Sequence, residues 1–519
     1  ADRESGQPVR PPMLTELSAE ATSGRWMNVE VLTGMPGCGK SYAMRQEAIQ
    51  TPGLYLFVYS SIALVEEQSA AFAAETGIPV VQAHSKASGS GSVQNRLERH
   101  REYFASNRID HAVVLMTHEG LMGADLSAFA DWNVRIDEAP TTIQSNVVRA
   151  PASADLLKQT IQIVPFGSKG WGQLRLLGGR RNWTDLANDD LFKPLAEMMK
   201  HAARNEGVFV DTLDWKDSFG WCSIWPLASV AHCKSVKIAG ASYPISLGAI
   251  VAERWEGITF TPKVTVRPWT KQPSVRIHYF TQSHEGNTEF WKTRRGRGFI
   301  AKVADFIAAK EPSLGFWSAN DEVKPLLDHR LHGRPISAKA AGLNVYDDET
   351  SCAVIYSSKV TPGDRPAQAL FDITDDEILR AREDEDIFQF VMRGAIRRRD
   401  FDGDYDIYLY SKRQAEFVEA KLVAIGIGQS VTLVPEPGAG IMDAVPQPLR
   451  EIREAIAAEK KAERLADYKV REANRQKTRR ADRAKAEGRE PSANNGRGGR
   501  PVGSKDRKPR RPRGKSPSD

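Results

Sequence analysis

The chain has 519 residues, of which 41% are hydrophobic and 27% are charged, a balance typical of globular proteins. Its length predicts two or three domains plus extensions, and no stretch approaches the roughly 20 apolar residues of a membrane-spanning helix. We therefore expect no membrane partner.

The cysteines and the first residues favour a reducing compartment. The cysteines form no CxxC pair, which argues against a structural zinc site; they are Cys38, Cys222, Cys233 and Cys352. The sequence begins Ala-Asp-Arg-Glu and lacks the apolar segment of an export signal. We expect a cytoplasmic or nucleoid-associated protein.

The positive charge is concentrated at the C-terminal end. Residues 451–519 contain 22 Lys and Arg against 11 Asp and Glu, a net +11, which leaves the first 450 residues at −5 within the total of +6. This asymmetry predicts an appended arm that binds a polyanion, rather than a uniformly basic body.

A phosphate-binding loop follows the first predicted strand. Residues 1–25 are polar and proline-containing, which indicates a flexible lead-in. An apolar run over 29–32 predicts a strand, and 42–49 predicts a helix. Between them, Gly34–Ser41 matches G-x-x-x-x-G-K-[ST], so the candidate nucleotide-binding residues are Gly34, Met35, Pro36, Gly37, Cys38, Gly39, Lys40 and Ser41.

Each part of this loop has a chemical reason. The glycines let successive N–H groups turn toward an anion, Lys40 can reach the β and γ phosphates, and Ser41 can hold Mg²⁺. The alternative is a glycine-rich turn without a ligand.

Apolar strands and helices alternate after the loop. Strands are expected at 54–59, at 111–116 and around Val134 and Ile136, helices from Ile62 and over 95–104, and a Ser/Gly-rich loop over 84–92. This α/β alternation predicts a parallel sheet with helices on both faces, whose ligands bind at the carboxyl ends of the strands.

Asp137 and Glu138 follow one of these strands. Asp137 is placed to hold Mg²⁺ through water beside the phosphate loop, and Glu138 to accept a proton from an attacking water. The alternative is that the two carboxylates only cap the next segment.

Residues 141–235 have uneven patterning and are expected to be an inserted module. They contain Trp215, Trp221 and Trp225, which either fill a small core or stack on unpaired bases; we favour the core. A strand resumes at 236–239.

A second alternating unit begins near Val275. Strands are expected at 275–280, 314–317, 352–356 and 407–410, and a helix over 299–310 after the basic run Lys292, Arg294, Arg295 and Arg297. Because this unit has no phosphate loop, any nucleotide it contacts must lie across an interface.

In this order the motifs resemble those of superfamily 2 helicases, DEAD/DEAH-like translocases with two RecA-like lobes. Gly34–Ser41 is similar to motif I, 59–68 to motif Ia, 116–121 to the Thr-His-Glu-Gly-Leu strand end, 137–140 to motif II and 240–242 to motif III. In the second lobe, 318–321 is similar to motif IV, 337–344 to motif V and 389–397 to motif VI.

The resemblance implies a domain plan. It gives a first RecA-like lobe over 26–262 that contains the insertion 141–235, and a second over 263–445. It also implies that Ser60 and Thr117 contact DNA. No adenine-reading Gln motif precedes the loop, so ATP as the nucleotide is implied by the family resemblance alone.

Motif VI departs from the family pattern, because Met392 and Ile396 replace a glycine and an arginine. If the segment is one helix, Gln389, Arg393 and Arg397 fall at i, i+4 and i+8 on one stripe. One arginine then serves as an arginine finger on the γ phosphate. An exposed basic helix face is the alternative.

The C-terminal tail resembles an AT-hook. Residues 446–490 suit a charged, solvated helix, and 491–519 are expected to be disordered. The stretch around Gly-Arg-Pro is similar to a minor-groove reader of A·T-rich duplex, with a looser second copy; the candidate residues are Arg497, Arg500, Pro501, Lys505, Arg511 and Arg513. A plain basic tail is the alternative.

Together these patterns favour an ATP-dependent DNA helicase or translocase that uses ATP and Mg²⁺, with single-stranded DNA in the lobe groove and RNA not excluded. The alternatives are a packaging or remodelling ATPase that does not unwind DNA, and a non-enzymatic DNA-binding protein with a vestigial loop.

Overall fold

The structure is a computed structural model that describes residues 28–87, 91–149, 161–166, 170–177, 195–204, 207–211, 218–265, 269–339, 345–427, 430–436, 470 and 473–474. The chain divides into two compact units, Ala1–Asp443 and Ala444–Asp519. The predicted lead-in 1–25 lies outside the described residues, as do nearly all of the predicted charged helix and the whole AT-hook-like tail. Among the helices described, none is long and apolar enough to cross a membrane.

The first sheet is parallel throughout and follows the order β12-β1-β11-β5-β2-β4-β3. Its strands are β1 (Asn28–Thr33), β2 (Leu54–Tyr59), β3 (Val80–Ala83), β4 (Ala112–Thr117), β5 (Trp132–Asp137), β11 (Ser235–Ala239) and β12 (Thr259–Val264). The helices that accompany it are α2 (Lys40–Gln50), α3 (Ile62–Glu75), α4 (Val93–Ser106), α5 (His118–Gly123), α9 (Leu247–Val251), η2 (Leu227–Val230), η3 (Tyr243–Ile245) and η4 (Ala252–Glu256).

The hydrophobic runs of this sheet are buried on both faces. In β2, Leu56 and Val58 pack into one core while Tyr55, Phe57 and Tyr59 pack into another on the opposite face. Strands covered on both sides read as continuous apolar runs, which is why the sequence marks them clearly.

The insertion forms a separate antiparallel sheet in the order β6-β10-β9-β8-β7. Its elements are β6 (Ile143–Val148), β7 (Ile161–Pro165), β8 (Trp171–Leu176), α8 (Ala196–Ala202), β9 (Gly207–Asp211) and β10 (Phe219–Ile224). Trp221 and Trp225 are each 2% exposed, in agreement with the core interpretation; Trp215 lies outside the described residues.

The second sheet is also parallel, in the order β15-β14-β16-β17-β13-β18. Its strands are β13 (Ser274–Thr281), β14 (Phe316–Ala319), β15 (Arg334–Pro335), β16 (Ser351–Ile355), β17 (Asp404–Ser411) and β18 (Val431–Pro435). Its helices are α10 (Thr288–Lys292), α11 (Arg294–Lys310), α12 (Lys324–Asp328), η5 (Pro362–Asp364), α13 (Arg365–Phe371), α14 (Asp375–Leu379), η6 (Arg380–Asp384), α15 (Glu385–Val391), η7 (Ala395–Arg397) and α16 (Lys412–Ala424).

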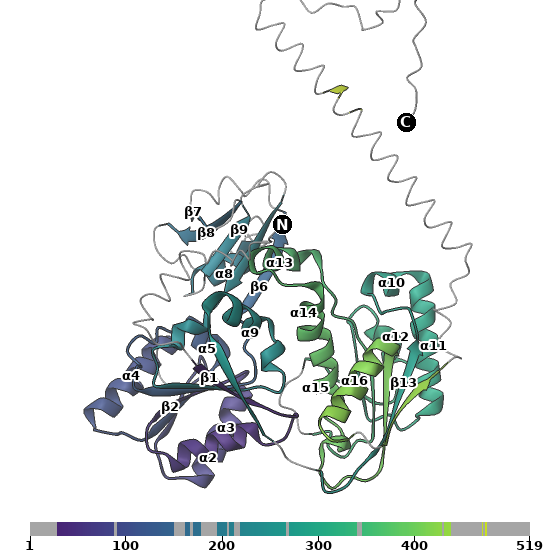
Figure 1. Cartoon of the computed structure of the whole chain (residues 1–519), viewed down its shortest axis with the longest axis horizontal. Coiled ribbons are helices and arrows are strands. Elements are labelled where there is room, and N and C mark those ends of the chain that lie inside the picture. The colour runs from purple at the N-terminus through teal and green to yellow at the C-terminus, as the bar shows by residue number, and fades with distance from the viewer. Residues whose placement is uncertain are drawn as a thin grey trace, which may run out of the picture. The chain divides into compact units, whose positions relative to one another are not determined.

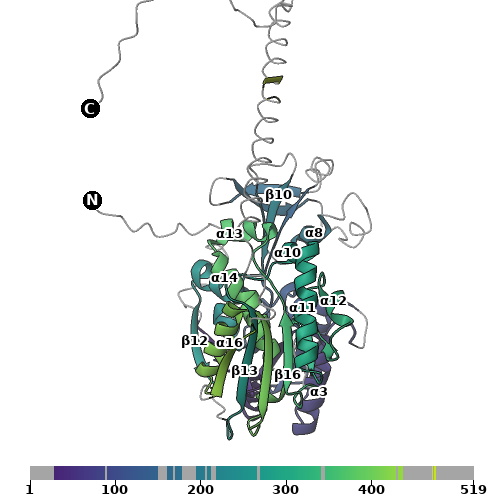
Figure 2. The same ribbon diagram turned by 90° about the vertical axis from the view of Figure 1, so that its right-hand side faces the viewer.

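The predicted α/β architecture with two parallel sheets, one in each lobe, is confirmed. Only β11 separates β1, which leads into the phosphate loop, from β5, which ends in Asp137. Figures 1 and 2 show the two sheets and the helices around them. The strand expected at 314–317 begins two residues later, at Phe316.

Candidate active site

The phosphate loop has a backbone that only glycine adopts without strain. Gly34, Gly37 and Gly39 have φ angles of 139°, 78° and 92°. Helix α2 begins at Lys40, and its N-cap Gly39 offers no side chain to the first-turn N–H groups. Those groups are left for another acceptor, which is the arrangement that binds phosphate at a helix N-terminus.

Lys40 lies folded over the loop. Its Nζ donates to the carbonyl oxygens of Gly34 at 3.0 Å and Met35 at 2.9 Å. Burial lowers the pKa of Lys40, and the nearby Cys38 and Asp137 oppose that shift. The ammonium is thus held at the centre of the loop, close to where a polyphosphate would lie.

Strand β5 carries Asp137 to the loop. Ser41 Oγ lies 2.9 Å and 2.8 Å from the two carboxylate oxygens of Asp137, in donating position. Burial, assisted by the neighbouring Glu138, raises the pKa of Asp137 to about 7. A hydroxyl and a carboxylate are hard oxygen ligands of the kind that Mg²⁺ prefers, and two half-buried carboxyl groups side by side favour a cation.

Glu138 is one of three non-glycine residues with positive φ among those described, at 65°. Its N–H donates to the Ala239 carbonyl at 2.7 Å, and its carboxylate accepts a hydrogen bond from Ser60. Burial raises the pKa of Glu138, while Ser60 and Arg393 lower it. A backbone conformation of this kind costs about 1 to 3 kcal/mol and is often found at functional sites.

The second lobe supplies the opposite wall. A cavity of about 660 Å³ is lined by the loop, by Asp137 and Glu138, by 240–242, and by Gln389, Arg393 and Arg397. Arg393 is 6% exposed and bonds the Ser337 carbonyl at 3.4 Å; burial lowers its pKa, and the charge of Glu138 raises it.

Arg397 lies against the phosphate loop itself. A Cβ placed on Gly37 would be 2.2 Å from Arg397 Nε, so this approach requires glycine at position 37. Gln389 lines the cavity and donates from Nε2 to Glu385 Oε1 at 2.8 Å.

The predicted helical stripe over 389–397 is wrong. Helix α15 ends at Val391, and Gly394 leaves helical geometry with ψ −168° before the short helix η7. A Cβ on Gly394 would lie 2.2 Å from the Tyr405 hydroxyl, so a close tertiary contact bends the chain here. Arg393 and Arg397 therefore reach the cavity from a turn instead of from one helix face.

The two residues expected to contact DNA in the first lobe have internal hydrogen bonds. Thr117 accepts from the Gly120 N–H at 3.2 Å and caps α5, and Ser60 bonds Glu138. Thr117 is the last residue of β4 and Ser60 directly follows β2, and their contact with DNA stays a prediction. Gly342–Asn344 of the motif V segment lies outside the described residues, as do Arg497, Arg500, Pro501, Lys505, Arg511 and Arg513.

The sequence analysis missed His118. Its Nε2 lies 2.9 Å from the Asp137 carbonyl oxygen, and burial lowers its pKa to about 4, so the neutral ring donates to that carbonyl. His118 thereby supports the end of β5. The available signals were its place in the 116–121 motif and its position directly after a predicted strand, β4, which only β2 separates from the Asp137 strand.

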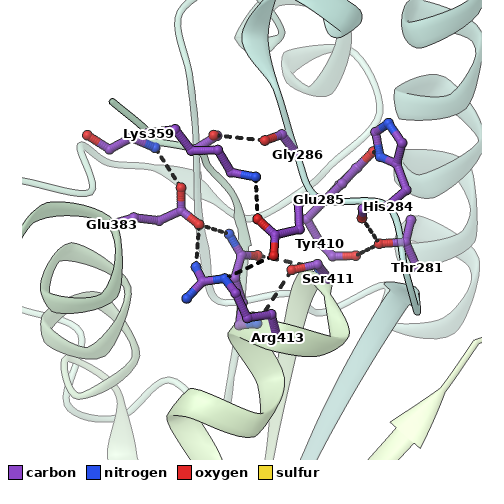
Figure 3. A network of polar contacts seen from close by, with 12 residues as sticks. Thr281, His284, Glu285, Gly286, Lys359, Glu383, Tyr410, Ser411 and Arg413 are labelled. Atoms are coloured by element: carbon purple, nitrogen blue, oxygen red, sulfur yellow. Dashed lines mark hydrogen bonds and ion pairs between the residues drawn. The ribbon is translucent and has the colours of Figure 1, made fainter. Parts of the chain in front are cut away.

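The corresponding edge of the second sheet contains a closed network of charges (Figure 3). Glu383 accepts from Arg413 at 2.7 Å and from the Ser358 N–H at 2.8 Å, and Arg413 also bonds Asp384 at 2.8 Å. Lys359 pairs with Glu285. The carboxylates of this edge are therefore paired with cations from the same lobe.

Comparisons with known proteins were made on sequence and structure. No family model and no curated protein matches the chain. Among solved structures, XPD in its apo form is 10% identical and aligns over 82% of this chain and 99% of that chain, with a TM-score of 0.48. An XPD helicase is 9% identical over 82% of this chain and 98% of that chain, at 0.45. S. cerevisiae Dbp5 bound to RNA and ADP–BeF3 is 10% identical over 85% and 93%, at 0.32. Because these identities are near one in ten and the TM-scores are under 0.5, the likenesses assign neither family nor activity to this chain.

Proposed function

We propose that the protein is an ATP-dependent DNA helicase or translocase that hydrolyses ATP between its two lobes. The observation that carries the proposal is the convergence of three groups on one cavity. They are the phosphate loop, the carboxylates Asp137 and Glu138, and the arginines Arg393 and Arg397 of the second lobe.

The residues divide the chemistry among them. Lys40 and the first-turn N–H groups of α2 bind the phosphates, and Ser41 and Asp137 would hold Mg²⁺. When bound, the metal withdraws charge from the phosphate oxygens. Glu138 orients a water and accepts its proton, and Arg393 or Arg397 stabilises the charge that develops on the transferred phosphate.

The nucleic-acid half of the proposal depends on the motif resemblance and on charge. Ser60 and Thr117 lie at the carboxyl ends of the neighbouring strands β2 and β4, and the +11 tail adds sequence-independent attraction to phosphate. We propose single-stranded DNA in the lobe groove and A·T-rich duplex on the tail.

The proposal is tested by ATP turnover of the full chain alone, with single-stranded DNA, with duplex DNA and with RNA, followed by a fork assay. Stimulation by DNA with strand displacement supports the helicase. DNA-stimulated turnover without displacement favours the packaging or remodelling ATPase, and DNA binding without turnover favours the vestigial loop.

The tail is tested separately. Replacing Arg497 and Arg500 by alanine removes two phosphate-binding charges, so DNA affinity falls and its salt dependence flattens by about 2 in log–log slope. Turnover without DNA should not change, since the proposal gives these residues no part in hydrolysis.

A further inference from the structure

A second contact joins the two lobes away from the phosphate loop. One apolar core is shared between the first-lobe residues Ile143, Phe166, Phe209, Cys222, Ile224 and Val251 and the second-lobe residues Ala367, Leu370, Phe371, Ile373 and Ile378. Helix α13 lies against strand β10 of the insertion, as Figure 2 shows. The insertion and α13 therefore form one packed structure that includes both lobes.

Directional bonds fix this contact. Arg254 of η4 donates to the Asp372 carbonyl at 2.9 Å and pairs with Glu377 of α14. Trp255 Nε1 donates to the Phe371 carbonyl at 3.2 Å, and its ring meets Phe371 edge to face. We call the contact made by Arg254, Trp255, Phe371, Asp372, Glu377 and Ile378 the interlobe anchor.

The anchor lies at the start of the helical run that carries the cavity wall. Helices α14, η6 and α15 follow one another without a gap from Asp375 to Val391 (Figure 1). Ile378 and Glu377, near the start of this run, belong to the anchor. One face of the remainder lines the nucleotide cavity, through Ala381, Arg382, Glu385, Asp386 and Gln389.

The two arginines come directly after the end of the same series of helices. Arg393 follows α15 by two residues and faces Glu138, and Arg397 follows in η7 against Gly37. Arg382, on the cavity wall, also forms an ion pair with Asp364 at 2.6 Å. Asp364 directly precedes the first residue of α13. A displacement at the anchor would therefore be transmitted along the run to both arginines.

We infer that the interlobe anchor positions Arg393 and Arg397 over the phosphate loop, with Arg254 and Glu377 as positioning residues for hydrolysis. This inference rests on the proposed ATPase function. Because Lys40 and the loop belong wholly to the first lobe, the anchor controls the rate of the chemical step and leaves nucleotide affinity to the loop.

The test uses the full chain with ATP and saturating single-stranded DNA. Arg254→Ala removes the ion pair and the bond to Asp372, and Glu377→Gln neutralises the pair while its amide oxygen can still accept from the Thr374 N–H, which Glu377 now caps at 2.9 Å. Both variants should lower kcat by about ten- to a hundredfold, the scale of a misplaced catalytic group, with the Kd for a non-hydrolysable ATP analogue unchanged within about twofold.

Arg330→Ala is the matched control. Arg330 also bonds a carboxylate, Asp305 at 2.9 Å, and a carbonyl, Leu326 at 2.8 Å, but both partners lie in the second lobe outside the anchor. Its kcat should equal that of the wild type. Equal thermal melting of the three variants would exclude global unfolding as the cause.

A double-mutant cycle distinguishes positioning from a general structural effect. In a chain that already carries Arg393→Ala and Arg397→Ala, adding Arg254→Ala should lower kcat no further. Additive losses, an unchanged kcat in Arg254→Ala, or a Kd that weakens as much as kcat would each overturn the inference while leaving the ATPase proposal intact. A wild-type chain without turnover would overturn both.

Discussion

The carboxyl edges of the two parallel sheets are built from similar residues, but their carboxylates differ in how fully nearby cations compensate their charge. At the first edge Asp137 and Glu138 are half-buried, their pKa values are raised, and Glu138 has strained backbone geometry. At the second, Glu383 is 1% exposed yet accepts from Arg413, Gln414 and the Ser358 N–H.

The difference lies in where the compensating cations are. Arg413 belongs to the helix that directly follows β17, so the second edge is neutralised from within its own lobe. The cations that face the first edge are Lys40, which is bonded to its own loop, and arginines from the other lobe. A buried carboxylate with its charge satisfied contributes to stability, whereas one left partly uncompensated is available to a ligand.

Among the variants proposed here, Lys40→Ala should have the largest effect, and that effect should be on ATP turnover at the first edge. It removes the cation that the loop holds beside Asp137, so we expect ATP turnover to fall at least about a thousandfold. Phosphate release measures the loss, and an unchanged melting temperature shows that the fold is retained. Wild-type turnover in this variant would contradict the assignment of the cavity.

Arg397→Ala tests which of the two second-lobe arginines acts on the phosphate across the cavity. Its guanidinium lies on the loop at Gly37, whereas Arg393 is held by Ser337 and Glu138. We expect kcat to fall about a thousandfold in Arg397→Ala and clearly less in Arg393→Ala, measured in single turnover. Arg398→Ala, which removes a pair with Asp348 and a contact with the Phe401 ring and does not line the cavity, is the neighbouring control, and the reverse ranking would exchange the two roles.

Arg413→Ala should destabilise the second edge without changing nucleotide binding at the first. It leaves Glu383 and Asp384 buried without their main cation, so the free energy of unfolding should fall by about 3 to 5 kcal/mol. Urea denaturation measures it, against Arg330→Ala, whose more exposed pair with Asp305 should cost less than about 1 kcal/mol. Nucleotide affinity should persist at temperatures where the variant is folded. A small loss of stability would mean that the network is not a structural element.

The two edges also differ in how well the sequence predicted them. The sequence singled out the loop, Asp137 and Glu138 because each lies at or directly after the end of an apolar strand, a signal that a few adjacent residues carry. The closed network and the anchor were not located. Arg413 and Glu383 are thirty residues apart, and Arg254 and Glu377 are 123 apart, so their pairing depends on tertiary packing.

The same limit explains the error in motif VI. The residues around Gly394 have helical spacing, and nothing local shows that the Tyr405 hydroxyl occupies the position of a Cβ. Tertiary contact therefore overrode a local helical pattern. All three predicted side chains still line the cavity, because the turn replaces the helix without moving them to another face of the lobe.

Glu256 provides a control carboxylate that belongs to neither edge. Its Oε2 accepts the Ala228 N–H at 2.7 Å at the start of η2, and burial raises its pKa to about 7 from the ordinary 4.5. Between those two pH values the folded state holds a proton that the unfolded state has lost. The Glu256 contribution to stability is therefore intact below about pH 4.5 and declines as the pH rises to about 7, by at most about 3 kcal/mol.

Glu256→Gln replaces the ionising group with a neutral acceptor for the same N–H. The difference in unfolding free energy between variant and wild type should shift in favour of the variant from pH 5 to pH 8, measured by urea denaturation at each pH. ATP turnover at fixed pH should be unaffected, since Glu256 does not line the nucleotide cavity. A pH-independent difference would show that Glu256 is ionised throughout. The raised pKa values of Asp137 and Glu138 would then distinguish the first edge from Glu256 more sharply than they do when burial raises the pKa of Glu256 as well.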